Sequence, residues 1–143
     1  MVQIQVRYEG ELHCNSVHGP SGTQLATDAP VDNQGRGESF SPTDLVATAL
    51  GTCMLTTMGI VAKRHGWAIE GASATVEKIM VADPARRIGK LDVKITMPGG
   101  LDERARETLE RTAHTCPVAK SLAATVEIPV AFEWGSAAAK SRS

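Results

Sequence analysis

The three cysteines, Cys14, Cys53 and Cys116, are the residues of this sequence with the clearest capacity for chemistry. A cysteine thiolate is a strong nucleophile that can be oxidised reversibly to a sulfenic acid or a disulfide. Three widely spaced cysteines do not make a secreted disulfide framework, and no Cys/His spacing is typical of zinc. We therefore expect free thiols, with no metal ion and no other cofactor.

Cys53 stands in the segment Leu50-Gly51-Thr52-Cys53-Met54 of an apolar stretch. A lone cysteine in such a helix is more often a small core residue than a nucleophile, and that alternative stays open. Gly51 and Thr52 are small enough to let another group approach the thiol. In helical register, the apolar residues nearest to Cys53 are Leu50, Met54, Leu55 and Met58. They predict an apolar pocket for an alkyl group.

Cys116 comes directly before Pro117. Proline disfavours helix at the preceding residue and suits the first helical position, so Cys116 is predicted at a helix N-terminus. Amide dipoles, together with His114 and Lys120, would then stabilise its thiolate. An inert helix cap is the alternative for Cys116. We expect Cys14, in a strand of mixed character, to be structural.

The helix that carries Cys53 is predicted to begin at Ser41, with Pro42 in the first position and Asp44 closing a capping box, and to end at Gly66. No charge occurs over residues 45–62, and apolar residues lie on every side of the helix. A membrane span is the less favoured alternative, because threonines interrupt the stretch and roughly 20 apolar residues are usually needed. A helix that is apolar all round needs cover that one sheet cannot supply, so we expect a second subunit.

The other elements are half-buried strands and one surface helix. The helix is predicted over residues 102–115, with Glu107 and Arg111 spaced to form an ion pair. Alternating polarity predicts strands over residues 2–8, 72–80, 90–97 and 125–134, and a hairpin over residues 11–27. Pro129 favours an edge position for the last strand. This order of elements predicts an α+β fold.

Length and composition limit the class of protein. The 143 residues are enough for one domain, expected over residues 1–135, followed by a mobile tail over residues 136–143. A net charge of −1 and 3% aromatic residues argue against nucleic acid as a partner. The N-terminus has a strand pattern and no secretion signal, which predicts a cytoplasmic protein without a membrane partner.

The sequence resembles the family of osmotically inducible protein C and organic hydroperoxide resistance protein (OsmC/Ohr). The resemblance rests on Ser41-Pro42-Thr43-Asp44-Leu45 leading to Gly51-Thr52-Cys53, and on Cys116-Pro117-Val118. It implies an OsmC-like fold, with antiparallel β-sheets wrapped around long central helices in an intertwined homodimer. It also implies thiol-dependent reduction of organic hydroperoxides, with Cys53 as the peroxidatic and Cys116 as the resolving cysteine. The implied reductant is a small dithiol or a lipoylated protein.

The sequence departs from the family's peroxidases in the groups that activate the thiolate. Those proteins place a glutamate after the proline that opens the helix and an arginine in an N-terminal strand or loop. Here Thr43 follows Pro42, and His13 and Arg36 are the remaining candidates for the cation. The resemblance is therefore to the OsmC-like subgroup. A redox-sensing or ligand-binding protein that uses the same cysteine pair, and a structural module with inert cysteines, remain the alternatives.

Overall fold

The computed structural model describes residues 1–136, so residues 137–143 of the predicted tail lie outside the described part. The chain divides into two compact units, Met1–Val46 and a second unit that begins at Ala47. The single domain predicted over residues 1–135 stays a prediction.

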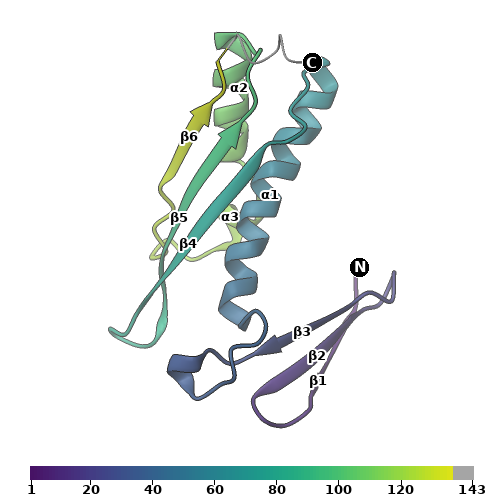
Figure 1. Cartoon of the computed structure of the whole chain (residues 1–143), viewed down its shortest axis with the longest axis vertical. Coiled ribbons are helices and arrows are strands. Elements are labelled where there is room, and N and C mark those ends of the chain that lie inside the picture. Colours follow the sequence, from purple (N-terminus) through teal and green to yellow (C-terminus); the bar gives the residue numbers. More distant parts are fainter. Residues whose placement is uncertain (137–143) are drawn as a thin grey trace. The chain divides into compact units, whose positions relative to one another are not determined.

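The N-terminal unit is built around an antiparallel sheet of three strands in sequence order (Figure 1). These strands are β1 (Ile4–Tyr8), β2 (His13–His18) and β3 (Gln24–Asp28). The predicted hairpin is confirmed, since His13 pairs with Asp28 and Val17 with Gln24 across the turn. Gly22 adopts a φ of 74° in that turn, a conformation that favours glycine. A short 3₁₀ helix, η1 (Val31–Asn33), follows.

The start of α1 (Pro42–His65) is confirmed as a capping box. The backbone N–H of Asp44 donates to the Ser41 hydroxyl at 3.0 Å, and the N–H of Ser41 donates to the Asp44 carboxylate at 2.9 Å. The helix ends before Gly66, whose φ of 74° is not helical. Beyond it, the N–H of Trp67 donates to the carbonyl of Ala62 at 2.9 Å and so caps the last turn. Sequence-local chemistry therefore defines both ends of the helix that carries Cys53.

The second unit has a three-stranded sheet in the order β4 (Ser73–Val81), β5 (Arg87–Met97) and β6 (Val130–Trp134). β6 is an edge strand, as Pro129 predicted, but it pairs parallel to β5. The prediction of antiparallel sheets is therefore wrong for this pair. A long connection that contains α2 (Glu103–Ala113) and α3 (Pro117–Ser121) carries the chain back to the end of the sheet where β5 begins. The next strand must then run in the direction of β5.

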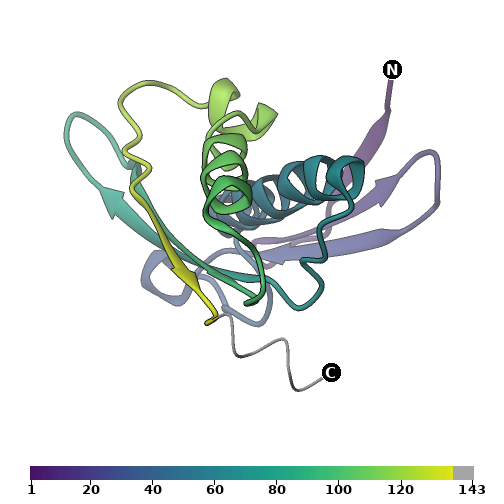
Figure 2. The same ribbon diagram turned by 90° about the horizontal axis from the view of Figure 1, so that it is seen from above.

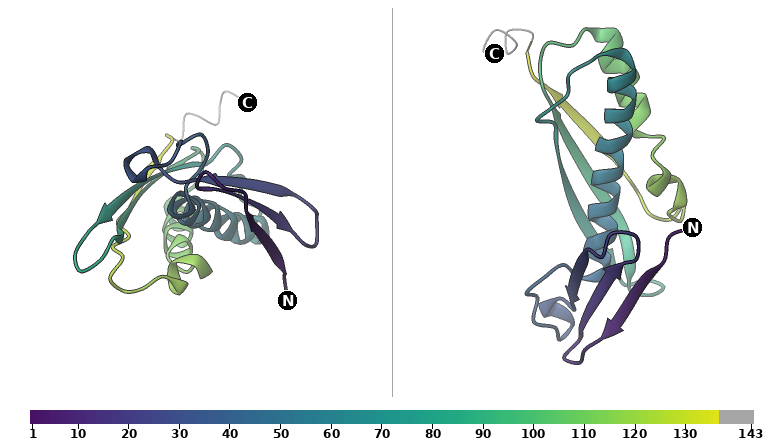
Figure 3. Two further views of the ribbon diagram at one scale, coloured as in Figure 1. Left: turned by 90° about the horizontal axis from the view of Figure 1, so that it is seen from below. Right: turned by 90° about the vertical axis from the view of Figure 1, so that its right-hand side faces the viewer.

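The helices α1 and α2 cover the same face of this sheet (Figures 2 and 3). The apolar side chains of this unit with no more than 2% exposure come from α1, β5, α2 and the start of α3: Leu50, Met54, Met58, Ala62, Leu91, Val93, Ile95, Met97, Ala105, Leu109, Ala113 and Cys116. The buried residues of α2, Ala105, Leu109 and Ala113, lie four positions apart on one side of the helix, and Asp102 caps this helix by accepting from the N–H of Ala105 at 2.8 Å. The core of the second unit is thus a two-helix layer on one sheet.

Only one side of α1 is buried within the chain. Its buried residues recur at helical spacing, whereas Thr48, Thr52 and Thr56 are exposed. The helix is long and apolar enough to cross a membrane by length and composition, with a mean hydropathy of 1.8. The core helix of a globular protein meets the same criterion, and α1 supplies three large side chains to this core. The membrane span stays the less favoured alternative.

Candidate functional site

Cys53 lies in the middle of α1, and its side chain is only partly buried. Its sulfur lies 4.0 Å from the hydroxyl oxygen of Thr57, one turn further along the helix. That hydroxyl donates to the backbone carbonyl of Cys53 at 2.7 Å. Thr57 therefore holds a hydroxyl beside the thiol. This role of Thr57 was not predicted, although residues four positions apart in a helix are neighbours, so a polar residue at that spacing after the cysteine could have indicated it.

Cys116 is the N-cap of α3, as predicted, and it is fully buried. Its backbone is extended, and its sulfur accepts a hydrogen bond from the N–H of Ala119 at 3.3 Å. Pro117 occupies the first helical position, where its missing N–H leaves no donor unsatisfied. The sequence Cys-Pro thus positions a sulfur atom at the start of a short helix.

The structure brings Cys53 and Cys116 together. Burial, first, and side-chain hydrogen bonding to Cys53 raise the pKa of the Cys116 thiol above its usual value, against the backbone N–H of Ala119, which lowers it. The prediction of a stabilised Cys116 thiolate is therefore wrong. His114 is exposed and packs edge-on to Phe132, and Lys120 is exposed, so neither offsets the loss of water around the sulfur.

The apolar pocket predicted from Leu50, Met54, Leu55 and Met58 is wrong for every residue but Leu55, which is partly exposed; Leu50, Met54 and Met58 belong to the core. All three side chains are at most 1% exposed in the core and offer no surface to a ligand. Gly51 belongs to the same buried side, where a Cβ would lie 3.1 Å from a methyl group of Val76 in β4. Its small size allows α1 to pack closely on the sheet.

A groove between α1 and α2 lies beside the cysteine pair. It has a volume of about 630 Å³ and is lined by Thr57, Ile60, Val61, Arg64, Thr108, Arg111, Thr112, Thr115 and Pro117. Thr57, whose hydroxyl oxygen lies 4.0 Å from the Cys53 sulfur, and Pro117, which follows Cys116 in the sequence, line the groove, whereas neither cysteine does. This groove was not predicted, because its two walls come from helices whose packing is not visible in the sequence.

Cys14 lies in β2 of the N-terminal unit, where it pairs with Tyr8 of β1 and Thr27 of β3. Its side chain is partly buried and its thiol is free. A structural role for Cys14 remains the expectation.

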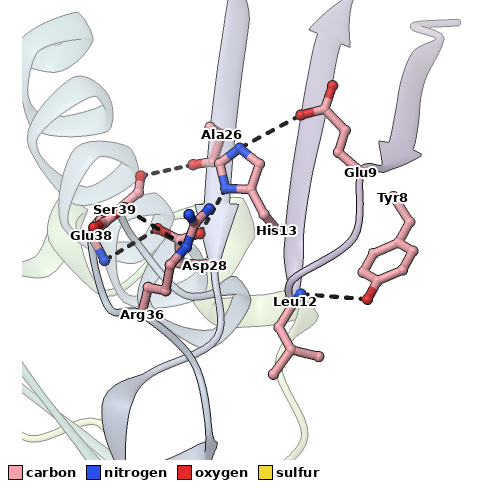
Figure 4. A network of polar contacts seen from close by, with 9 residues as sticks. All are labelled: Tyr8, Glu9, Leu12, His13, Ala26, Asp28, Arg36, Glu38 and Ser39. Atoms are coloured by element: carbon pink, nitrogen blue, oxygen red, sulfur yellow. Dashed lines mark hydrogen bonds and ion pairs between the residues drawn. The ribbon is translucent and has the colours of Figure 1, made fainter.

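His13 and Arg36, the two candidate cations, lie in a polar network around Asp28 in the N-terminal unit (Figure 4). Asp28 is 2% exposed; it contacts Nδ1 of His13 at 2.6 Å and accepts from the N–H of Glu38 at 3.1 Å. The hydrogen bond to His13, first, and the charges of His13 and Arg36 lower the pKa of Asp28 despite its burial. His13 is therefore hydrogen-bonded to the Asp28 carboxylate, while Arg36 acts on it through its charge and pairs with Glu38.

Residues 1–136 contain no group of three or more His, Cys, Asp or Glu side chains that could hold a metal ion. The described site offers two neighbouring thiols, one partly exposed and one buried. An accessible thiol can attack an electrophile, and its neighbour can then close a disulfide.

The fold and this pair of thiols define an α+β protein with a two-cysteine site at its core helix. Residues 35–131 match the OsmC-like protein family, and the chain belongs to that family. A search of curated proteins finds no match.

Solved structures share the fold over nearly the whole chain. A candidate osmotic stress induced and detoxification response protein from Psychrobacter arcticus is 44% identical, with 93% of this chain and 96% of that chain covered and a TM-score of 0.88. An organic hydroperoxide resistance protein OsmC from Legionella pneumophila is 21% identical over 93% and 96% of the two chains, with a TM-score of 0.72. A candidate organic hydroperoxide resistance protein from Vibrio cholerae, with captopril in one active site, is 17% identical over 92% and 90%, with a TM-score of 0.71. These last two show the fold alone.

Proposed function

We propose that this protein is a thiol peroxidase that reduces organic hydroperoxides to alcohols. The Cys53 thiolate attacks the distal oxygen of ROOH, the O–O bond breaks, and the alkoxide leaves as ROH after taking a proton. Cys53 is then a sulfenic acid. The Cys116 sulfur attacks it, so that a disulfide forms and water leaves. A dithiol reduces the disulfide by exchange and becomes oxidised itself.

The observation that carries this proposal is the difference in exposure between two interacting thiols. Cys53 is accessible to a substrate, whereas Cys116 is fully buried next to it. A peroxide can therefore reach Cys53 first, and the resulting sulfenic acid has a thiol within reach. Family membership and the hydroperoxide resistance proteins among the related folds support the same chemistry.

The proposal includes the partners implied by the sequence. The exposed, uncharged threonines of α1 favour a homodimer that covers this side of the helix. The reductant is a small dithiol or a lipoylated protein, and the protein acts in the cytoplasm without nucleic acid or membrane as a partner.

Thiol counting tests the reaction. One equivalent of cumene hydroperoxide should remove two thiols from each wild-type chain and yield one equivalent of alcohol. Mass spectrometry of peptides should locate the disulfide between Cys53 and Cys116. Cys53→Ser should consume no peroxide, while the matched control Cys14→Ser should behave as the wild type. Unchanged thiol counts in the wild type would refute the proposal.

A redox sensor that uses the same pair of cysteines is the second candidate. His13 and Arg36 were the candidate cations for activating the Cys53 thiolate, but they are engaged with Asp28 and Glu38. A thiol without such a cation suits a slow sensor better than an efficient enzyme. Repeated turnover separates the two functions. In the presence of dithiothreitol, an enzyme consumes many equivalents of hydroperoxide far faster than dithiothreitol alone, whereas a slow sensor adds little to the rate of dithiothreitol alone.

A further inference from the structure

The hydroxyl group of Thr57 lies beside the sulfur that the proposed reaction uses. Thr57 follows Cys53 by four residues in α1, so the two side chains lie on one side of the helix. The hydroxyl oxygen of Thr57 is 4.0 Å from the sulfur of Cys53, and both side chains are partly buried. Thr57 also lines the groove between α1 and α2, whereas Cys53 does not. The hydroxyl therefore adjoins both the sulfur and the groove.

This hydroxyl is bonded to the backbone in the structure, but it is free to turn. It donates to the backbone carbonyl of Cys53 at 2.7 Å. In an α-helix the same carbonyl accepts from the N–H of the residue four positions later, which is Thr57 itself, so it keeps a partner when the hydroxyl turns away. A hydroxyl hydrogen rotates about the bond between carbon and oxygen to suit its acceptor. The hydroxyl can thus donate to the sulfur without any break in the helix.

A thiolate at Cys53 has no nearby charge on its own helix. The closest charged residues along α1 are Asp44 and Lys63. With a rise of 1.5 Å per residue, they lie roughly 14 Å and roughly 15 Å along the axis from Cys53. The Debye length is about 10 Å at 0.1 M salt, so solvent screens charges at such distances.

The elements packed around this site add one neutral thiol and two arginines. Burial raises the pKa of Cys116 at the start of α3, which keeps this thiol neutral. Arg64 of α1 and Arg111 of α2 line the groove, and the ion pair predicted between Arg111 and Glu107 does not form in residues 1–136. Within these residues, the side chain of Cys53 makes polar contacts with Thr57 and Cys116 and with no charged group.

We infer that the hydroxyl of Thr57 donates a hydrogen bond to the Cys53 thiolate and stabilises this ion in place of a cation. Cys53 loses its proton to water, which reaches the partly exposed side chain, and the hydroxyl then turns from the carbonyl to the sulfur. A hydrogen bond to an ionised acceptor is shorter and about twice as strong as a neutral one, so the charge draws the donor closer. The inference rests on the proposed function, whose nucleophile is this thiolate, and adds the group that stabilises it.

Alkylation by iodoacetamide tests this donor without any peroxide. The thiolate is the reactive form, and mass spectrometry of peptides reports Cys53 separately from the other two cysteines. Thr57→Val replaces the hydroxyl by a methyl group of similar size and should lower the rate at neutral pH about tenfold. The deficit should shrink as the pH rises, because Cys53 then ionises without the donor. Thr57→Ser keeps the hydroxyl and should retain most of the wild-type rate.

Thr112→Val is the matched control on α2. The hydroxyl of Thr112 donates to the carbonyl of Thr108 at 2.7 Å and lines the same groove, but it does not contact the sulfur. Arg64→Gln and Arg111→Gln remove the two cations of the groove in turn. All three variants should be alkylated at the wild-type rate. If one of them reproduces the effect of Thr57→Val, the hydroxyl of Thr57 is not the specific donor and the inference is overturned.

A second variant without the hydroxyl guards against a defect in folding. Thr57→Ala favours the helix and should show the same loss of rate as Thr57→Val. Wild-type rates in both variants would overturn the inference. A deficit that is equal at every pH would overturn it as well, because it would report access to the sulfur and not its ionisation. The same holds if Thr57→Ser reacts as slowly as Thr57→Val.

The consumption of cumene hydroperoxide by the same proteins separates this inference from the proposed function. If alkylation depends on Thr57 as expected but the wild type consumes no hydroperoxide, the donor stands and the peroxidase fails. If the wild type consumes hydroperoxide but Thr57→Val is alkylated like the wild type, the peroxidase stands and the donor is refuted.

Discussion

The side chains of Cys53 and Cys116 interact, yet only Cys53 is accessible from the surface. The two thiols come from helices that are distant in the sequence, α1 and the start of α3. Burial keeps Cys116 protonated in the resting protein, because it raises the pKa of this thiol. The two cysteines are therefore unequal before any peroxide arrives.

This inequality predicts different outcomes for the two serine variants. Cys116→Ser should reduce one equivalent of cumene hydroperoxide and then stop, because the first step needs only Cys53. Its sulfenic acid should persist and be labelled by a dimedone probe, as measured by intact mass. In the same experiment without a reductant, the control Cys14→Ser should also consume one equivalent but form the disulfide, so that the probe labels no sulfenic acid. Absence of a labelled sulfenic acid in Cys116→Ser would mean that the roles of the two cysteines are exchanged.

The raised pKa of Cys116 predicts how the second step depends on pH. The thiolate is the attacking form, and its fraction in the folded protein continues to grow above pH 9.0, the usual pKa of the group. The rate of disulfide formation after a pulse of hydroperoxide should therefore still rise between about pH 8 and pH 10. Rapid quenching followed by mass spectrometry measures this step. A rate that is constant above pH 8 would contradict the assignment.

The lowered pKa of Asp28 predicts loss of stability in acid for the N-terminal unit. A carboxyl whose folded pKa lies below its unfolded value of 3.8 stabilises the fold above pH 3.8 and loses this contribution as the pH falls through the folded pKa. Amide protection of β2 and β3 in hydrogen exchange should thus decrease below about pH 4. In Asp28→Asn this protection should be lower at pH 6 and depend little on acid, whereas Glu11→Gln should resemble the wild type.

The apolar part of the groove predicts a preference for alkyl hydroperoxides over hydrogen peroxide. Each buried methylene contributes roughly 0.8 kcal/mol, which corresponds to about a fourfold gain in kcat/KM. The ratio of kcat/KM for cumene hydroperoxide to that for hydrogen peroxide should be well above one. Ile60→Ser should lower this ratio, because Ile60 lines the groove. The control is Ile79→Ser, which replaces an exposed isoleucine of β4 outside the groove and should leave the ratio unchanged. A ratio of one or less in the wild type would remove the groove as a substrate site.

The exposed side of α1 predicts a homodimer. Thr48, Thr52 and Thr56 are exposed in a helix without charge between Asp44 and Lys63. Sedimentation at low micromolar concentration should give twice the mass of the chain. Thr52→Arg should shift the equilibrium toward the monomer, while Thr125→Glu, in the segment before β6, should leave it unchanged. A monodisperse wild-type monomer would contradict the dimer.

The features predicted well from the sequence are those that depend on neighbouring residues. The capping box of Ser41 and Asp44 was predicted because both partners lie within one turn, and Cys116 was predicted as a cap because Pro117 restricts it locally. The direction of β6 was not predicted, because alternation of polarity shows which side of a strand is buried and not which way the strand runs.

The electrostatics of the site were harder to predict for a related reason. The charges near Cys116 in the sequence suggested a stabilised thiolate, but its pKa depends mainly on burial, which is set by tertiary packing. Arg64 and Arg111 were ordinary surface residues in the sequence, and only the packing of α1 and α2 places them in one groove. Pairing of Cys53 with Cys116 was available only from the family resemblance.

In the proposed reaction, the cap of α3 makes the reduction potential of the pair Cys53 and Cys116 depend on a backbone hydrogen bond. The sulfur that accepts from the N–H of Ala119 is the same sulfur that is consumed in disulfide formation. By thermodynamic linkage, any capping energy that is lost on oxidation raises the reduction potential of the pair. A loss of about 1 kcal/mol corresponds to roughly 20 mV for a two-electron couple. The first turn of α3 therefore favours the reduced state of the pair by a small free energy.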